Sequence, residues 1–276
     1  MNALALAPPF PIALAAPSWA RMRVALFYRW RHGRWPDLDA PVRFTEWVQW
    51  RKLNDRCHSL ALLTDKAHSK AIAEARLGSA RTIPTLWLGE ALPEVAPWSM
   101  PFIVKSNHGC GQFVVVRKNA DYAKAKAAAP RWLKRAYGGL LDEWHYGAAR
   151  RLVLVEPYIG GAMLPMDYKV YVFGGRAALV QVHAGRGVNH RWTQFDRDWT
   201  ALSDDPIDAR KPDCLAEMLA AAEAMAGGDD FLRVDFYCEN DALKFGEYCL
   251  YPGSGLDPFT PDLLDLKLGA LWTQSA

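Results

Sequence analysis

The chain has 276 residues, 51% of them hydrophobic, which is enough for one large core or two to three small ones. Its 33 basic and 30 acidic residues leave a net charge of +3, without the dense basic stripe of a nucleic-acid-binding protein, so no nucleic-acid partner is expected. Five cysteines without a CxxC pair favour a reducing, cytoplasmic compartment and argue against a structural zinc site.

The first residues, 1–20, are apolar and rich in proline, but no basic region precedes the apolar stretch. We interpret them as a flexible lead-in rather than a signal peptide. The sequence has no uncharged apolar run of roughly 18 residues, so no transmembrane helix is predicted. The segment Arg21–Trp35 mixes arginines with aromatic residues, which is typical of an amphipathic helix that packs its aromatics inward. A peripheral contact with the inner membrane surface is the alternative.

An N-terminal domain is expected over residues 21–98. Thr45 is the expected N-cap of a helix that includes residues 46–50. A second helix is predicted over Lys66–Leu77, because Asp65 can open it and Gly78 can close it. A short strand over residues 85–88 follows, and three prolines at positions 93, 97 and 101 then mark a linker.

A central subdomain is expected over residues 99–156. Two β-branched runs, Phe102–Val104 and Phe113–Val116, flank a polar loop that contains Gly109 and Gly111, and this pattern predicts a β-hairpin. Lys105 ends the first strand, so a phosphate laid against the loop would meet backbone N–H groups and a cation. Because the lysine precedes the glycines, the loop is not a Walker loop. A surface hairpin with a glycine turn is the alternative. The remaining elements expected here are a helix over Tyr122–Tyr137 and a strand over Arg151–Val155 that delivers Glu156.

A C-terminal domain is expected over residues 157–276. Its predicted elements are a hairpin of Tyr168–Phe173 with Ala177–Val182, a helix over Leu215–Met225, a hairpin of Leu232–Cys238 with Leu243–Leu250, and a final helix after Thr260 and Pro261. Asp235 and Glu247 fall on the two strands of the last hairpin. Two carboxylates on adjacent strands suit magnesium, and an acidic pair within such apolar strands is costly unless it is neutralised. A solvated face of an edge hairpin is the alternative.

Six short segments, taken together and in order, resemble the ATP-grasp superfamily and most closely its TupA-like branch, which is linked to cell-surface polysaccharide and teichuronopeptide assembly. The resemblance runs from about Arg29 to about Leu271. The segments are Thr-Asp-Lys-Ala-His-Ser-Lys (64–70), Phe-Ile-Val-Lys-Ser-Asn-His-Gly-Cys-Gly (102–111), Val-Glu-Pro-Tyr-Ile (155–159), Asp-Tyr-Lys-Val-Tyr-Val-Phe-Gly-Gly-Arg (167–176), Phe-Leu-Arg-Val-Asp-Phe-Tyr (231–237) and Phe-Gly-Glu-Tyr-Cys-Leu-Tyr-Pro-Gly-Ser-Gly (245–255).

The resemblance implies an α+β fold that holds ATP between two α+β domains, with the glycine-rich hairpin as a lid. It also implies a set of site residues, carried over position by position. These are Lys66 and Lys105 with Gly109 and Gly111 for the phosphates, Glu156 and Ile159 for the adenine, Asp167 for the ribose, Lys169 near the phosphates or the acceptor, Arg186 with Lys105 as catalytic cations, and Asp235 with Glu247 for Mg²⁺. One position departs from the family pattern, since Cys249 stands where many members have an asparagine that binds a second metal, and a thiol is a poor magnesium ligand.

The implied activity is an ATP- and Mg²⁺-dependent ligase that joins a carboxylate to an amine through an acylphosphate and releases ADP. The substrates would be small molecules or groups linked to a polysaccharide. Three alternatives stay open from the sequence. They are a glycosyltransferase that uses the Asp196-Arg197-Asp198 triplet, a phosphotransferase on the same fold, and a non-catalytic binding relative.

Overall fold

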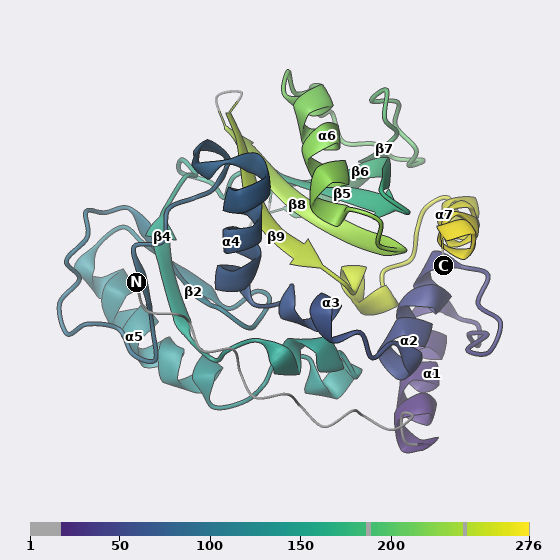
Figure 1. Ribbon diagram of the computed structural model, residues 1–276, viewed down its shortest axis with the longest axis horizontal. Coiled ribbons are helices and arrows are strands. Elements are labelled where there is room, and N and C mark those ends of the chain that lie inside the picture. The colour runs from purple at the N-terminus through teal and green to yellow at the C-terminus, as the bar shows by residue number, and fades with distance from the viewer. Residues whose placement is uncertain (1–17, 186–188, 240–241, 276) are drawn as a thin grey trace.

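The computed structural model describes residues 18–185, 189–239 and 242–275, and it shows two antiparallel sheets with helices around them (Figure 1). The α+β class predicted from the sequence is confirmed. The helices are α1 (Ser18–His32), α2 (Phe44–Asn54), α3 (His58–Leu62), α4 (Lys66–Leu77), α5 (Asn119–Leu133), α6 (Leu215–Ala226) and α7 (Asp262–Ser275). The strands are β1 (Trp87–Gly89), β2 (Phe102–Ser106), β3 (Phe113–Val116), β4 (Val153–Pro157), β5 (Asp167–Phe173), β6 (Arg176–Ala184), β7 (Arg191–Phe195), β8 (Phe231–Glu239) and β9 (Ala242–Cys249).

The smaller sheet has the strand order β1-β4-β2-β3 and lies with α5 at the left of Figure 1. Side chains alternate along β2, so Phe102 and Val104 pack with Tyr122 of α5 in a core of their own. Ile103 and Lys105 point to the opposite face and line a cavity. Strand β1, which lies in the expected N-terminal domain, pairs with β4 of the expected central subdomain.

The larger sheet has the order β7-β6-β5-β8-β9 and holds the main core of the protein. On one face, alternate residues of β5 and β8, such as Val170 and Val234, belong to the apolar core together with residues of α6. The other face has two zones. Toward one end it is aromatic, where Phe231 packs with Phe44 of α2 and Trp272 of α7. Toward the other end it is charged, and that end borders the cavity.

The beginning of α2 differs from the prediction. The helix starts at Phe44, with Arg43 at the N-cap position, whereas Thr45 was expected there. The Glu46 carboxylate accepts hydrogen bonds from the backbone N–H groups of Val42 and Arg43, and so supplies the cap. Thr45 lies inside the first turn, where its hydroxyl donates to Asp265 of α7 at 2.7 Å.

The cysteines also differ from the prediction at one pair. Cys214, which precedes α6, is joined to Cys238 of β8 by a disulfide, so the expectation of reduced cysteines is not met there. Cys57, Cys110 and Cys249 are free thiols. Within the described ranges, no helix is long and apolar enough to cross a membrane.

Candidate active site

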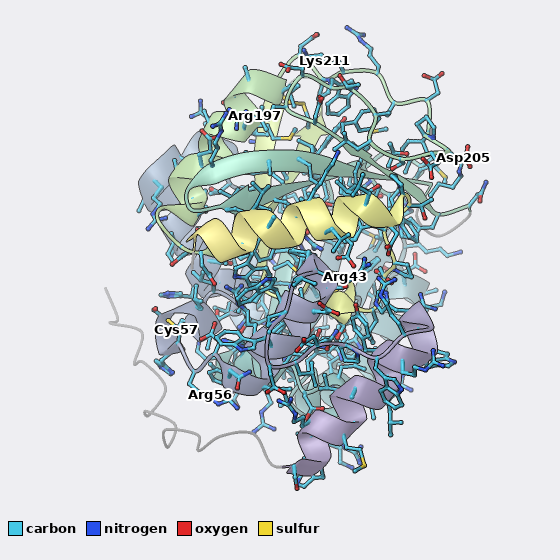
Figure 2. The ribbon with its side chains drawn as sticks, turned by 90° about the vertical axis from the view of Figure 1, so that its right-hand side faces the viewer. Arg43, Arg56, Cys57, Arg197, Asp205 and Lys211 are labelled. Atoms are coloured by element: carbon cyan, nitrogen blue, oxygen red, sulfur yellow. A yellow bond between two sulfur atoms is a disulfide. The ribbon has the colours of Figure 1, made fainter. Side chains whose placement is uncertain are left out.

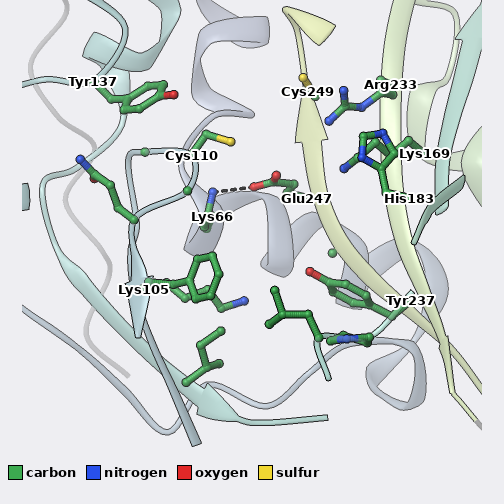
Figure 3. A pocket seen from close by; sticks show the side chains of 18 of the residues that line it. Lys66, Lys105, Cys110, Tyr137, Lys169, His183, Arg233, Tyr237, Glu247 and Cys249 are labelled. Atoms are coloured by element: carbon green, nitrogen blue, oxygen red, sulfur yellow. Dashed lines mark hydrogen bonds and ion pairs between the residues drawn. The ribbon is translucent and has the colours of Figure 1, made fainter. Parts of the chain in front are cut away.

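A cavity of about 490 Å³ lies between the two sheets. Figure 3 shows it from close by, with lysines from the smaller sheet and α4 facing charged side chains of the larger sheet. Its walls are β2 and β4 of the smaller sheet, β5, β6, β8 and β9 of the larger sheet, the loop that joins β2 to β3, and the Pro252–Gly255 turn after β9.

One wall carries a buried carboxylate between two lysines. Glu156 of β4 is 2% exposed and lies opposite Ile103 of β2. Its Oε1 accepts from Lys70 of α4 at 2.6 Å, and its Oε2 is ion-paired with Lys105. Burial acts to raise the pKa of Glu156, but the two ammonium groups outweigh it and hold the pKa below its ordinary value. Glu156 is therefore an anion that is shared by two cations at the wall.

The glycine-rich loop is fixed to α4 through Asn107, which is fully buried. The Asn107 backbone carbonyl accepts from the N–H of Lys66 at 3.1 Å, and its side-chain oxygen accepts from the N–H of Ala67 at 2.9 Å. These bonds satisfy N–H groups at the start of the helix and place Lys66 beside the loop. Gly111 has φ +70°, a left-handed conformation that favours glycine, and it allows the loop to turn back into β3.

Three strands of the larger sheet place charged residues side by side. Lys169 of β5 pairs in register with Asp235 of β8, and Asp235 pairs with Glu247 of β9. Lys169 Nζ lies 2.7 Å from Asp235 and 2.6 Å from Asp167. Arg233, two residues before Asp235 and on the same face, contacts both Asp235 oxygens at 2.7 Å.

A β-bulge sets the position of Glu247. Asp235 is opposite Glu247, but the next residue, Phe236, is opposite Phe245, so Gly246 is an extra residue in β9. A Cβ atom at Gly246 would come within 3.0 Å of the Asp235 carbonyl oxygen, which leaves little room for any other residue. The bulge therefore brings Glu247 to the cavity face while Phe245 stays in the core.

Lys66 joins the two halves of the cavity. Its Nζ lies 2.6 Å from Glu247 Oε2, the contact drawn as a dashed line in Figure 3. Burial acts to lower the pKa of Lys66, but the Glu247 carboxylate outweighs it, and the pKa lies above its ordinary value. For Glu247 the signs are reversed, since burial acts to raise its pKa and Lys66 holds it below the ordinary value. Both groups are therefore charged at neutral pH.

Asp235 and Glu247 have the ligand chemistry that would suit a magnesium ion. They face each other across two strands, and Mg²⁺ is usually held by one or two carboxylates together with substrate phosphates. The Glu247 side chain is 29% exposed and can reach a ligand, whereas Asp235 is almost fully covered by Arg233 and Lys169. Among the described residues, no cluster of three His, Cys, Asp or Glu could hold a metal by itself. Cys249 is buried opposite Arg233, and burial raises the pKa of its thiol well above the ordinary value, so it is a neutral group there.

The structure brings most of the predicted site residues to this cavity. Those that line it are Lys66, Lys105, Gly109, Gly111, Glu156, Ile159, Lys169 and Glu247. Asp167 and Asp235 lie behind the lining, where both are ion-paired with Lys169. Arg186 lies outside the described residues.

Two residues were missed by the sequence reasoning. Lys70 lies one helical turn after Lys66 in the same helix, and this i, i+4 spacing is the signal that could have found it. Arg233 lies two residues before Asp235 in a strand, so both side chains had to share one face. Arg233 lines the cavity and is a buried cation in the described part of the site.

Two antiparallel sheets that enclose a cavity of lysines and carboxylates, with a glycine-rich hairpin over it, define an ATP-grasp fold. A sequence model described as TupA-like ATPgrasp matches residues 46–273. The chain therefore belongs to the TupA-like ATP-grasp family, as its motifs predict. No curated protein matches the sequence.

Several solved structures are similar to this one. A D-alanine–D-alanine ligase from Helicobacter pylori matches with 16% identity and a TM-score of 0.45, over 77% of this chain and 60% of that one. The enzyme of the same name from Bacillus anthracis, complexed with ATP, matches with 14% identity and a TM-score of 0.45, over 78% and 66%. An L-amino acid ligase from Bacillus licheniformis matches with 12% identity and a TM-score of 0.44, over 70% and 42%. The chain thus spans less than two thirds of the length of each of these proteins.

Proposed function

We propose that the protein is an ATP- and Mg²⁺-dependent carboxylate–amine ligase that works through an acylphosphate. The observation that carries the proposal is the set of cations that converge on one cavity of an ATP-grasp fold. Lys66 and Lys105 face it from α4 and the smaller sheet, and Lys169 and Arg233 face it from the larger sheet. Such a set is suited to a polyphosphate and to the negative charge that develops during phosphoryl transfer.

In the proposed reaction, a carboxylate oxygen of the first substrate attacks the γ-phosphorus of ATP, and the bond from that phosphorus to the bridging β–γ oxygen breaks to release ADP. The amine of the second substrate then attacks the acyl carbon, loses a proton and displaces inorganic phosphate. Lys66 and Lys105 would hold the phosphates, and Arg233 would stabilise charge at the transferring group. Bound magnesium, held by Glu247 and Asp235, would supply further neutralisation of the phosphate oxygens.

We place this activity in cell-surface polysaccharide or teichuronopeptide-like biosynthesis. What supports this assignment is membership of the TupA-like family alone. The first substrate would then be a uronic acid or an amino acid, and the second an amino acid or an amino sugar, each free or linked to a polysaccharide.

The geometry does not favour the glycosyltransferase alternative. The Asp196 carboxylate accepts backbone N–H bonds from Asp198 at 2.9 Å and from Thr200 at 2.7 Å, so it stabilises a turn after β7. Arg197 is ion-paired with Glu223 of α6 at 2.5 Å. None of the three triplet residues lines the cavity described above.

The test is ADP release from ATP and Mg²⁺ in the presence of hydroxylamine, across a panel of uronic and amino acids. Carboxylate-dependent ADP together with a hydroxamate is expected, because hydroxylamine traps an acylphosphate. Lys105→Ala and Glu247→Ala should abolish both signals. ADP without hydroxamate would point to a phosphotransferase instead, and the absence of both ADP release and a melting-temperature shift with ATP would overturn the nucleotide assignment.

A further inference from the structure

Helix α1 exposes a stripe of large apolar side chains, which we call the α1 stripe. It consists of Trp19, Met22, Leu26 and Trp30, which are 58%, 66%, 53% and 73% exposed. Their spacing of three, four and four residues places them on one side of the helix. The other side of α1 is buried, and its core residues are Ala20, Val24 and Tyr28. The protein therefore leaves this side of an otherwise well-packed helix uncovered, at the end of the molecule seen at the bottom of Figure 2.

The stripe is accompanied by positive charge. Helix α1 contains four arginines and no Asp or Glu. Arg21 and Arg23 are ion-paired with Asp39 and Asp142, whereas exposed Arg29, next to Trp30, makes no ion pair with any described carboxylate. Tryptophan and arginine are enriched in helices that lie at the boundary between lipid headgroups and acyl chains. The pattern of charge is therefore complementary to an anionic surface.

The sequence that precedes α1 is consistent with the same surface. Residues 1–17 contain no Asp, Glu, Lys, Arg or His, and they are composed mainly of Ala, Leu, Pro, Phe and Ile. The segment joins the chain at Ser18, the first residue of α1. An uncharged apolar segment thus leads directly into the helix that carries the stripe.

We propose that the α1 stripe docks the protein on the surface of a bilayer that contains anionic lipid. A second copy of the chain is a less favourable occupant. A two-fold interface made by this face would bring the arginines of both helices together, and like charges at an interface are repulsive. The proposal does not depend on the ligase activity, because it rests only on the surface of α1.

Docking at this face would affect the cavity, because the end of α1 contacts one of its walls. Arg31 Nε donates to the Leu256 carbonyl at 3.0 Å, and His32 Nε2 lies 3.1 Å from the Gly255 carbonyl. Gly255 ends the Pro252–Gly255 turn, whose Gly253 and Ser254 line the cavity. A helix held at the bilayer would therefore hold this wall of the cavity near the membrane surface.

The experiment is co-sedimentation of the full chain with sucrose-loaded vesicles. One set of vesicles contains phosphatidylcholine alone, and the other contains an equimolar mixture with phosphatidylglycerol. We expect binding to the mixed vesicles that weakens as salt is added, since salt screens the attraction of arginines for lipid phosphates. The double variant Leu26→Ser/Trp30→Ser should bind about tenfold more weakly or worse, because two large apolar side chains leave the interface.

The matched control is Val95→Ser/Met163→Ser, which removes two exposed apolar side chains from other parts of the surface and should bind like the original protein. Arg29→Gln provides a second variant that does not alter the apolar stripe, and it should reduce binding to the anionic vesicles only. Melting temperatures of all variants report whether they are folded. Equal binding of the stripe variant and the control, equal binding to both kinds of vesicle, or no binding to either would overturn the proposal. Self-association that the stripe variant abolishes, without vesicle binding, would assign the surface to a second copy.

Discussion

Lys66, the first residue of α4, and Glu247, the third residue from the end of β9, form an ion pair of 2.6 Å. Each side chain of the pair neutralises the charge of the other across the cavity. An anion that binds Lys66 would break the ion pair and leave the Glu247 carboxylate unpaired. A cation that binds Glu247 would leave the Lys66 ammonium unpaired. We therefore expect the pair to couple the binding of a phosphate to the binding of a metal ion.

We expect ATP to bind at least about tenfold more tightly with Mg²⁺ than without it, since each ligand replaces one partner of this pair. In Glu247→Gln, Lys66 no longer has to leave a carboxylate, so ATP alone should bind more tightly than it does to the original protein. The increase in ATP affinity that Mg²⁺ causes should be largely lost in this variant. Isothermal titration calorimetry with and without Mg²⁺ measures both effects.

The control for this experiment is Glu217→Gln, which removes an exposed partner of Arg81 at a distance from the cavity lining. It should leave ATP affinity and its magnesium dependence unchanged. An unaltered magnesium gain in Glu247→Gln would contradict the coupling.

Glu156→Gln should destabilise the protein in a pH-dependent way. The folded-state pKa of Glu156 lies below its ordinary value because Lys105 and Lys70 favour the anion. The unfolded chain therefore binds a proton more readily, and the stabilisation is fully present above a pH of about 4 to 5. This stabilisation by the Glu156 anion is lost as the pH falls through the folded-state pKa of Glu156.

At neutral pH we expect Glu156→Gln to lower the free energy of unfolding by about 3 kcal/mol, because two partly covered ammonium groups lose their common anion. The difference from the original protein should shrink as the pH falls below about 4. Urea denaturation across the acidic range measures it. Glu223→Gln, at a more exposed pair with Arg197, should show a smaller loss. A difference for Glu156→Gln that does not change with pH would be inconsistent with this account.

Arg233→Lys should lower the rate of ADP formation by about a hundredfold while it changes the ATP affinity by less than about fivefold. A lysine keeps the charge but cannot contact both Asp235 oxygens as the guanidinium does. The measurement is steady-state ADP release together with ATP affinity by calorimetry. Arg210→Lys, in an exposed pair with Asp213, is the matched control and should leave both quantities unchanged. Full activity of Arg233→Lys would remove Arg233 from the reacting part of the site.

Thiol labelling should report nucleotide binding. Cys110 lines the cavity, and both the low-dielectric walls and the Glu247 carboxylate raise the pKa of its thiol. Iodoacetamide reacts with the thiolate, so Cys110 should react slowly at neutral pH and faster as the pH is raised. ATP with Mg²⁺ should slow the reaction further by covering the loop.

Peptide mapping by mass spectrometry measures each cysteine separately. Exposed Cys57 is the internal control, and its rate should not change with ATP. Buried Cys249 should react only after unfolding. Protection of Cys57 and Cys110 to the same extent would indicate a general effect of ATP rather than occupation of the cavity.

Local signals in the sequence were sufficient for much of the fold. Helix α4 has the predicted bounds because Asp65 accepts the N–H of His68 and Gly78 can take the positive φ that ends a helix. The hairpin β2–β3 follows from its β-branched strands and its glycines. The start of α2 was wrong by two residues, because the Glu46 carboxylate accepts the backbone N–H of the Arg43 cap and the helix therefore begins before Thr45.

What the sequence did not show depends on pairings between distant segments. Asp235 and Glu247 were recognised as a pair, but their ion pairs with Lys169 and Lys66 depend on the sheet order and on where α4 packs. The ion pair between Lys70 and Glu156 depends in the same way on where α4 packs. The disulfide between Cys214 and Cys238 also depends on a distant pairing, because the two residues are 24 positions apart and Cys238 lies on another element.

The extra residue at Gly246 determines which way the end of β9 faces. If Gly246 were paired regularly with Asp235 instead of bulging, Glu247 would lie opposite Val234 on the face that packs against α6. Tyr248, whose hydroxyl now donates to the Met225 carbonyl in the core, would turn toward the cavity. The bulge at this one glycine thus decides whether an acid or a phenol faces the position proposed for the metal, and deletion of Gly246 would leave Glu247 opposite Asp235.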